Sequence, residues 1–255
     1  MIKKPNFFIV GTPKGGTTSL FNYLEEHPEV YVPVLKEPHF FSVPEVLDTY
    51  YKTTIIKDEN TYLKLYKDVK EQKAIGDLST SYLFNKNSAK RIKKFNPDAR
   101  IIMVLRNPVD RAISHYLMDY NLGYINVPFS KIIQDKEKYS IFYREYIKLG
   151  YYETQVKNYY NLFDKSKILI VLSDELFSHP LKTISRIYNF IGVSKSYIPN
   201  TQNIYNQYSK PKFKFIKKLI RSKKTMYILN HLPKGIKGTI KSKMYSDAEK
   251  PEFNK

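Results

Sequence analysis

The sequence of 255 residues contains no cysteine and no tryptophan. Without cysteine the chain forms no disulfides and no zinc–thiolate sites, which fits a reducing compartment. The five histidines lack the spacing typical of metal ligands, so we expect no bound metal. No run approaches the roughly 18 apolar residues of a membrane span, and the apolar run that Pro5 interrupts and Gly11 ends is too short for a signal peptide. These absences predict a cytoplasmic protein.

Acidic side chains are scarce as well: 24 Asp and Glu residues face 43 Lys and Arg residues, a formal net charge of +19. A field of that sign favours a polyanionic partner, such as nucleic acid, anionic lipid, an acidic glycan or a phosphorylated cofactor, without choosing among them. After about residue 205 the chain is strongly basic, and Phe213, Ile216, Lys217 and Ile220 fall at helical spacing. We expect a mostly helical C-terminal segment over about 205–255: a surface helix, a membrane-surface helix or a wall of an anionic substrate cleft.

Short apolar runs rich in β-branched and aromatic residues alternate with helix-compatible stretches. We expect strands in four of these runs: 7–10, 73–78, 99–106 and 167–176. We expect one helix from about Gly16 to Glu26 and another that ends at Gly192. Continuous apolar strands alternating with helices are typical of a parallel sheet with helices on both faces. The sequence therefore predicts a single α/β domain over 1–255 with three layers, its core over 6–193.

The stretch FIVGTPKGGTTSL, residues 8–20, combines a strand, a glycine-rich turn and a helix start. Such a turn makes an anion site, because free backbone N–H groups point at the ligand and the helix dipole favours negative charge. The loop of nucleoside triphosphatases reads G-x-x-x-x-G-K-[ST]. Here Thr17 takes the lysine position, and the lysine is Lys14, inside the loop. We expect the anion to be held by backbone at Gly15 and Gly16 and by hydroxyls of Thr17, Thr18 and Ser19.

A second motif, IIMVLRNPVDRAISHY over 101–116, places an arginine where a buried strand ends. Arg106 is suited to bidentate contact with a phosphate. Asn107 is suited to cap the next helix and Pro108 to begin it, with Ser114 further along the same helix. Alone, this motif reads as a surface arginine beside a capped helix. With the glycine-rich turn about 90 residues earlier, that interpretation becomes the less favoured one.

Together these motifs resemble the sulfotransferase family that uses 3′-phosphoadenosine 5′-phosphosulfate (PAPS). TPKGGTTSL is similar to its 5′-phosphosulfate loop, most of all in the branch of heparan sulfate and related carbohydrate sulfotransferases, and Arg106 with Ser114 matches its second motif. The resemblance covers most of residues 6–193. It implies a P-loop-like fold related to nucleotide kinases, with PAPS as cosubstrate. The branch's lysine-glycine-arginine loop has no match in the C-terminal segment.

The segment LKEPHFFS, residues 35–42, is similar to one that carries a catalytic glutamate in the carbohydrate branch, and the resemblance places that role on Glu37. Sulfuryl transfer requires a general base, because the acceptor must lose a proton when it attacks the sulfuryl group. Lys14 would offset charge on the bridging oxygen. His39 either orients Glu37 or shares proton transfer, and the alternative is a packed polar residue without a role in the reaction. Asp77 is, with His39, the next candidate base, and Asp77-Leu78 replaces the Glu-Lys of many heparan sulfate enzymes.

The sequence therefore predicts in-line transfer of the sulfuryl group from PAPS to a hydroxyl or amine, with a glycan or glycolipid as the favoured acceptor. Two alternatives stay open. A P-loop nucleotide kinase would need a lysine near position 17 and a magnesium-binding carboxylate pattern. A basic module that binds nucleic acid or an anionic membrane explains the C-terminal segment, but not the ordered set of Lys14, Glu37, Arg106 and Ser114. We expect no nucleic-acid partner. We do expect a peripheral contact of the C-terminal segment with anionic membrane or acidic glycan.

Overall fold

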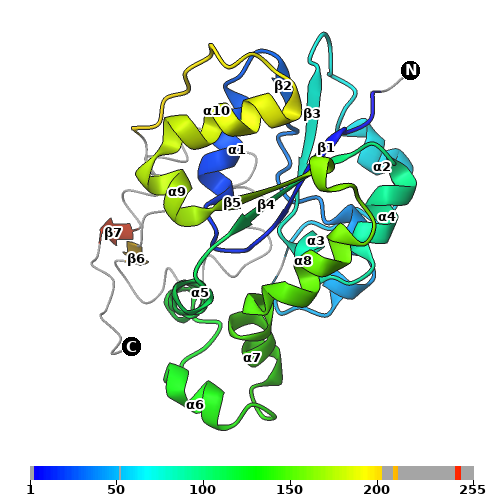
Figure 1. The fold of residues 1–255 in the computed structure, drawn as a ribbon. Helices are drawn as coiled ribbons and strands as arrows, with labels where there is room; N and C mark the ends of the chain where they lie inside the picture. Colours follow the sequence, from blue (N-terminus) through cyan, green and yellow to red (C-terminus); the bar gives the residue numbers. More distant parts are fainter. Residues whose placement is uncertain (1–2, 52, 203–208, 212–244, 248–255) are drawn as a thin grey trace.

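The computed structural model describes residues 3–51, 53–202, 209–211 and 245–247. Within these ranges a central sheet of five strands has the order β2-β3-β1-β4-β5, and every neighbouring pair is parallel (Figure 1). The strands are β1 (Phe7–Gly11), β2 (Val30–Tyr31), β3 (Ala74–Leu78), β4 (Arg100–Leu105) and β5 (Ile168–Leu172). The parallel α/β architecture predicted from the alternating apolar runs is confirmed.

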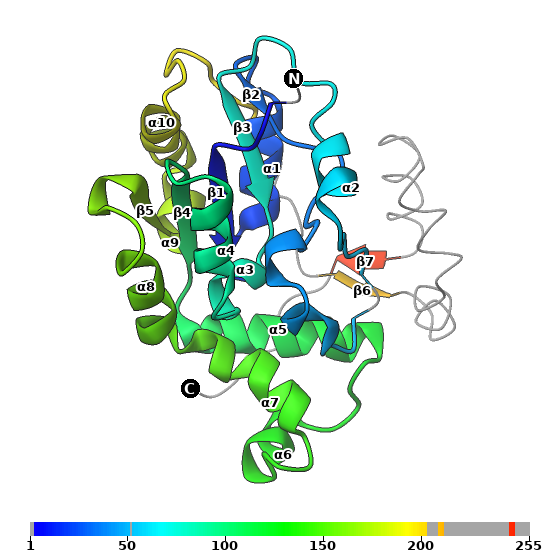
Figure 2. The same ribbon diagram turned by 90° about the vertical axis from the view of Figure 1, so that its right-hand side faces the viewer.

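Helices connect these strands and cover the sheet. The α-helices are α1 (Thr17–Glu25), α2 (Glu59–Lys64), α3 (Ser81–Phe84), α4 (Ser88–Phe95), α5 (Pro108–Leu122), α6 (Phe129–Gln134), α7 (Ser140–Tyr146), α8 (Tyr152–Tyr160), α9 (Ser173–Ser178) and α10 (Pro180–Ile191). Short 3-10 turns are η1 (Phe40–Ser42), η2 (Glu45–Leu47), η3 (Lys148–Gly150) and η4 (Lys165–Lys167). Figures 1 and 2 show α1, α9 and α10 on one face of the sheet and α2, α3, α4 and α8 on the other.

The strand β1 shows why both faces are covered. Its side chains point alternately to opposite faces, as in any strand. Phe7 and Ile9 pack with residues of α1 and α10, whereas Phe8 and Val10 pack with residues of α2, α3 and α4. All four side chains are buried, and each contributes roughly 1.5–3 kcal/mol of hydrophobic free energy. The continuous apolar run therefore requires a layer of helices on each side.

The fourth predicted strand is too long. β5 ends at Leu172, and α9 begins at Ser173, so the prediction is wrong for 173–176. Acidic side chains in the first turn favour a helix N-terminus, and Glu175 also accepts the backbone N–H of Leu172 at 3.4 Å. The helix predicted to end at Gly192 does so, and this glycine takes the left-handed conformation with φ of 80°.

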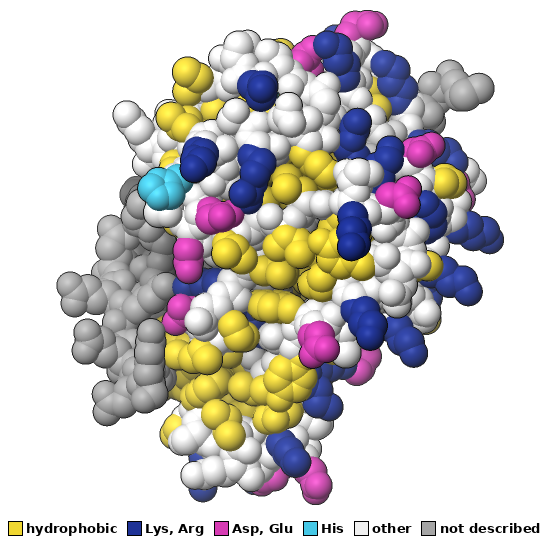
Figure 3. All heavy atoms as spheres, in the orientation of Figure 1, with side chains coloured by type: hydrophobic (Ala, Val, Ile, Leu, Met, Phe, Trp, Pro, Cys, Tyr) yellow, Lys and Arg dark blue, Asp and Glu magenta, His cyan; other side chains and the backbone are white. Residues whose placement is uncertain are grey.

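Side chains protect the outer edge of the sheet at β5. Arg186 donates to the carbonyl of Ile170 at 3.4 Å and pairs with Glu175 at 2.8 Å. Since unpaired strand edges invite pairing with other chains, these contacts oppose such association. The large apolar side chains exposed nearby in sequence include Leu172 and Phe177. Figure 3 shows hydrophobic side chains gathered on the face seen in Figure 1, with Lys and Arg scattered around them.

The C-terminal segment is described only in part. Ser209–Pro211 (β6) and Tyr245–Asp247 (β7) form an antiparallel pair. The amphipathic helix expected around Phe213 and Ile220 lies outside the described residues, as do the proposed contacts of this segment with a membrane or glycan. In the part of the chain that the structure describes, no helix is long and apolar enough to cross a membrane.

Candidate active site

The predicted site residues lie where β1, β3 and β4 end. The glycine-rich turn follows β1, and Arg106 follows β4. The segment with Glu37 is tied to the third strand, because the N–H of Glu37 donates to the carbonyl of Leu78 at 2.9 Å. In open parallel sheets, ligands bind beyond the carboxyl ends of the strands. The fold therefore brings three segments far apart in sequence to the edge where a ligand is expected.

The glycine-rich turn packs tightly against β4. The N–H of Thr12 donates to the carbonyl of Val104 at 2.7 Å, and a Cβ atom on Gly15 would lie 2.8 Å from that same oxygen. Gly16 has φ of 96° and is the N-cap of α1, so no side chain caps the first N–H groups of this helix. Uncapped N–H groups and the helix dipole form an anion site. Thr17 and Ser19 are buried, whereas Thr18 is half-buried.

Arg106 contacts the same turn. Its Nη1 atom donates to the carbonyl of Lys14 at 3.1 Å. The helix that follows begins as predicted, because Asn107 Oδ1 accepts the N–H groups of Val109 at 2.9 Å and Asp110 at 3.3 Å. Ser114 is half-buried in this helix, α5. The structure thus brings together the two segments that are predicted to bind phosphate, because Arg106 contacts the glycine-rich turn.

Glu37 is held by three neighbours and remains accessible. Thr80 Oγ1 donates to Glu37 Oε2 at 2.9 Å. His39 Nε2 lies 3.7 Å from the same oxygen, and Lys36 Nζ lies 3.7 Å from Glu37 Oε1. The side chain of Glu37 is 27% exposed. A carboxylate fixed in this way, yet reachable from solvent, is suited to accept a proton from a bound molecule.

His39 lies between Glu37 and a serine pair. Its Nδ1 atom is 2.8 Å from Ser81 Oγ, and this hydroxyl is 2.7 Å from Ser42 Oγ. Burial lowers the pKa of His39, although the nearby Glu37 acts in the opposite direction. A neutral ring fixed by Ser81 on one side is suited to orient Glu37 on the other.

The three residues predicted to be catalytic share an unusual backbone. Among the described residues, Lys14, Glu37 and His39 are the non-glycine positions with positive φ, at 67°, 60° and 57°. This conformation costs an L-residue roughly 1–2 kcal/mol. Such strain persists where the surrounding structure imposes it, and it clusters at active sites and ligand clamps. The backbone therefore singles out the same three residues as the sequence motifs.

The side chain of Lys14 extends towards α5. Its ammonium lies 3.2 Å from the sulfur of Met118. The thioether is a weak hydrogen-bond acceptor, and the charge of Lys14 also acts on the buried Asp119 of the same helix. The prediction that Lys14 serves a ligand beyond the first phosphate stays a prediction.

Asp77 has a structural environment. Its carboxylate is fully buried and accepts hydrogen bonds from Tyr62 at 2.7 Å, Tyr82 at 2.8 Å and Ser79 at 3.0 Å. Burial raises its pKa to about 6 despite these three donors. A buried carboxylate with its oxygens occupied does not face an acceptor molecule. Asp77 therefore fits a role in the core and not that of the next candidate base.

This environment gives a pH-dependent contribution to stability. The pKa of Asp77 is near 3.8 when unfolded and about 6 when folded, so the folded state binds the proton more readily between these values. Stability from this group is thus present below about pH 4 and lost as pH rises through about 6, a change of about 3 kcal/mol. Urea unfolding of wild type and Asp77→Asn at pH 7 and at pH 4 measures this change. We expect the free energy of unfolding of wild type, relative to that of the variant, to be higher at pH 4 than at pH 7 by about 3 kcal/mol. A pH-independent difference would contradict this assignment.

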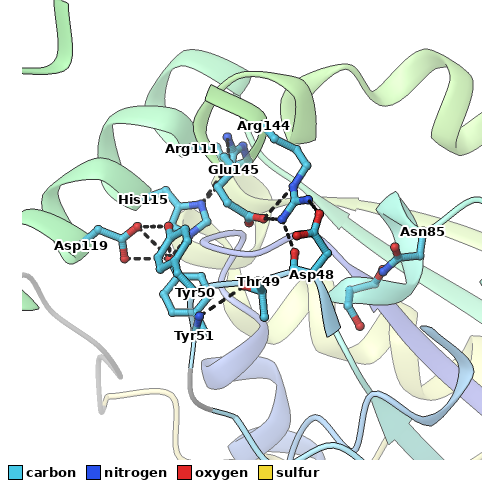
Figure 4. A network of polar contacts seen from close by, with 11 residues as sticks. Asp48, Thr49, Tyr50, Tyr51, Asn85, Arg111, His115, Asp119, Arg144 and Glu145 are labelled. Carbon is cyan, nitrogen blue, oxygen red and sulfur yellow. Dashed lines mark hydrogen bonds and ion pairs between the residues drawn. The ribbon is translucent and has the colours of Figure 1, made fainter. Parts of the chain in front are cut away.

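A second polar cluster anchors Tyr50 and Tyr51 on α5. Asp119 accepts hydrogen bonds from the hydroxyls of Tyr50, Tyr51 and Tyr146, the last at 2.7 Å. The hydroxyl of Tyr51 also lies 2.6 Å from His115 Nε2. Figure 4 shows Asp119 and His115 of the helix facing the two adjacent tyrosines. The cluster fixes the chain that follows the Glu37 segment to the helix that carries Ser114.

Several of these contacts cannot be predicted from the sequence. Thr80 and Ser81 follow β3, and polar residues after a buried strand are the one signal that points to them. Lys36 stands beside Glu37 in the quoted motif, but nothing in the motif indicates its contact with Thr18. The Asp119 cluster joins residues up to 69 positions apart, so no local sequence pattern predicts it.

A parallel sheet with a glycine-rich anion loop after its first strand and an arginine after its fourth defines a P-loop-like α/β protein. Within that class, the sequence matches the sulfotransferase domain family over residues 4–251. This match spans nearly the whole chain, and the chain belongs to the sulfotransferase family. The resemblance inferred from the two motifs is confirmed.

Similar proteins support this membership. The human (Homo sapiens) heparan sulfate glucosamine 3-O-sulfotransferase 6 is 26% identical over 207 residues, which cover 75% of this chain and 53% of that protein. Human carbohydrate sulfotransferase 15 is 24% identical over 248 residues, covering 74% of this chain and 44% of that protein. The chain therefore spans about half the length of the curated relatives it matches. The crystal structure of a sulfotransferase from Alicyclobacillus acidocaldarius is 34% identical, with a TM-score of 0.69, and the match covers 80% of this chain and 87% of that one.

Proposed function

We propose that this protein transfers the sulfuryl group of PAPS to a hydroxyl or amine of a carbohydrate acceptor. One observation carries the proposal: a held, accessible carboxylate, Glu37, lies beside the anion loop. Lys36 connects the two, since its ammonium is 2.9 Å from Thr18 Oγ1 and 3.7 Å from Glu37 Oε1. A donor anion in the loop and an acceptor beside Glu37 would therefore meet at this point.

Residues of both motifs would supply the contacts that the donor requires. The backbone of Gly15 and Gly16 and the hydroxyls of the first residues of α1 would hold the 5′-phosphosulfate. Arg106 and Ser114 would hold the 3′-phosphate, with Arg106 donating charge-assisted hydrogen bonds. Arg106 already contacts the carbonyl of Lys14, so one side chain would link both phosphate sites. Membership in the sulfotransferase family supports PAPS as the donor.

The reaction is a single in-line displacement. The acceptor oxygen or nitrogen attacks sulfur while the bond from sulfur to the bridging oxygen breaks. The proton of the acceptor goes to Glu37, which Thr80 and His39 hold in place. The negative charge that develops on the bridging oxygen stays on the 5′-phosphate of the product, 3′-phosphoadenosine 5′-phosphate (PAP). Lys14 offsets that charge.

The names of the relatives favour a sugar hydroxyl as the acceptor. Matched proteins include a heparan sulfate glucosamine 3-O-sulfotransferase and a carbohydrate sulfotransferase. A glycan or glycolipid is therefore the proposed acceptor class. A cytoplasmic location, with the basic C-terminal segment touching an anionic membrane, remains the expectation from the sequence.

Labelled sulfate transfer tests this function. The protein is incubated with radiolabelled PAPS, a chelator and a panel of glycans, glycolipids and simple phenols. We expect label on a carbohydrate acceptor without added metal. Transfer of phosphate from ATP in magnesium, with no sulfate transfer from PAPS, would instead identify a kinase.

A further inference from the structure

Lys36 has a position that the sequence motifs do not explain. Its ammonium is 2.9 Å from Thr18 Oγ1, at the start of α1, and 3.7 Å from Glu37 Oε1. Its side chain is 23% exposed. The ammonium thus contacts one group on the side proposed for the donor and one on the side proposed for the acceptor.

The path of the sulfuryl group passes this ammonium. In the proposed function, the donor phosphate lies at the start of α1 and the acceptor proton leaves towards Glu37. The sulfur must move between those two points along a nearly straight line. A cation that reaches Thr18 and Glu37 at once lies beside that line. We propose that Lys36 is a further catalytic residue whose ammonium contacts the sulfonate oxygens during transfer, an inference that rests on the proposed function.

The charges at the site explain why such a cation is needed. The sulfonate and the Glu37 carboxylate are both anionic, and transfer requires them to approach each other. Their repulsion is strong in a partly buried site, where the effective dielectric constant is far below that of water. An ammonium between them offsets this repulsion and donates charge-assisted hydrogen bonds to the sulfonate. Lys14 serves the bridging oxygen, so the two lysines act on different atoms of the donor.

The burial of Lys36 agrees with this role. Burial lowers the pKa of Lys36, and the neighbouring Glu37 opposes that shift. Glu37, on the same loop, is the anionic group that faces Lys36, and Thr18 of α1 is uncharged. A further anion beside this ammonium would stabilise its charged form. We therefore expect the site to bind a nucleotide that carries a sulfonate more tightly than the same nucleotide without the sulfonate.

Binding of PAPS and PAP separates this role from a structural one. PAP lacks the sulfonate, so Lys36→Met should weaken PAPS binding by about tenfold more than PAP binding, a difference typical for a lost hydrogen bond to a charged group. Lys57→Met is the matched control, since it removes an exposed lysine from the same connection between β2 and α2. Calorimetry with both nucleotides, with Lys36→Gln as a second uncharged variant, gives the ratio of affinities. Melting temperatures confirm that each variant folds.

The outcomes distinguish the two proposals. An unchanged ratio of PAPS to PAP affinity in both uncharged variants would overturn the role of Lys36, whether overall binding falls or not. Restoration of part of the ratio by Lys36→Arg would support it, because arginine keeps the charge. A wild-type protein that binds neither nucleotide would contradict the proposed function itself.

Discussion

Glu37→Gln should slow sulfuryl transfer by about 10²- to 10⁴-fold, the usual contribution of a general base, and leave nucleotide affinity near the wild-type value. Glutamine keeps the size of the side chain, and its amide oxygen still accepts the hydrogen bond from Thr80. It takes no proton from the acceptor. Single-turnover transfer with a working acceptor, combined with calorimetry of PAP, measures both quantities.

Lys14→Ala is the informative companion to this variant. Lys14 lies in the anion loop, so its loss should weaken nucleotide binding as well as slow transfer. A purely structural glutamate would instead lower the melting temperature along with activity. Glu37→Gln protein that transfers sulfate at the wild-type rate would remove Glu37 from the mechanism, and His39 would become the candidate base.

Arg106→Ala should weaken PAP binding by roughly 10- to 150-fold, because it removes charge-assisted contacts to a phosphate worth about 1.5–3 kcal/mol. It also removes the hydrogen bond from Arg106 to the carbonyl of Lys14, so the anion loop loses a support. The preference for PAP over the analogue without a 3′-phosphate should shrink with it. Calorimetry with both nucleotides measures this preference.

Arg186→Ala is a control for the loss of an arginine. Arg186 pairs with Glu175 at an exposed site, where the side chains are 44% and 42% exposed, and such pairs contribute little to stability. It should leave nucleotide binding unchanged. An Arg106→Ala protein that keeps its full preference for the 3′-phosphate would show that another group holds this phosphate, with the lysines of the C-terminal segment as the next candidates.

Local sequence patterns predict well the strands, the helix ends and the loop that surround the site. The glycine loop, the cap at Asn107 and the helix that ends at Gly192 depend on residues within a few positions of one another. Continuous apolar runs likewise identify β1, β3 and β4 because a strand buried on both faces needs them. The error at 173–176 arose because Leu172 and Leu176 continue the apolar pattern of β5 into a helix that Glu175 helps to begin.

The parts of the site that sequence patterns do not predict depend on contacts between distant segments. The environment of Glu37 depends on Thr80, which lies 43 residues away. The contact of Lys36 with Thr18 joins a loop to the start of α1 through side chains 18 residues apart. Neither contact has a periodicity or a cap that a sequence pattern would reveal. The candidate catalytic residues can therefore be predicted from a motif, whereas the groups that hold them are identified only in the folded structure.

Calorimetric titration with PAP and with ATP, each in excess chelator and in magnesium, tests the central claim most directly. In the proposed function, the anion loop and Arg106 bind the negative charges of the nucleotide, and both are parts of the chain itself. We therefore predict that PAP binds equally well with and without chelator and that ATP binds more weakly in both conditions. Binding that prefers ATP and disappears in chelator would contradict the assignment to a sulfotransferase site.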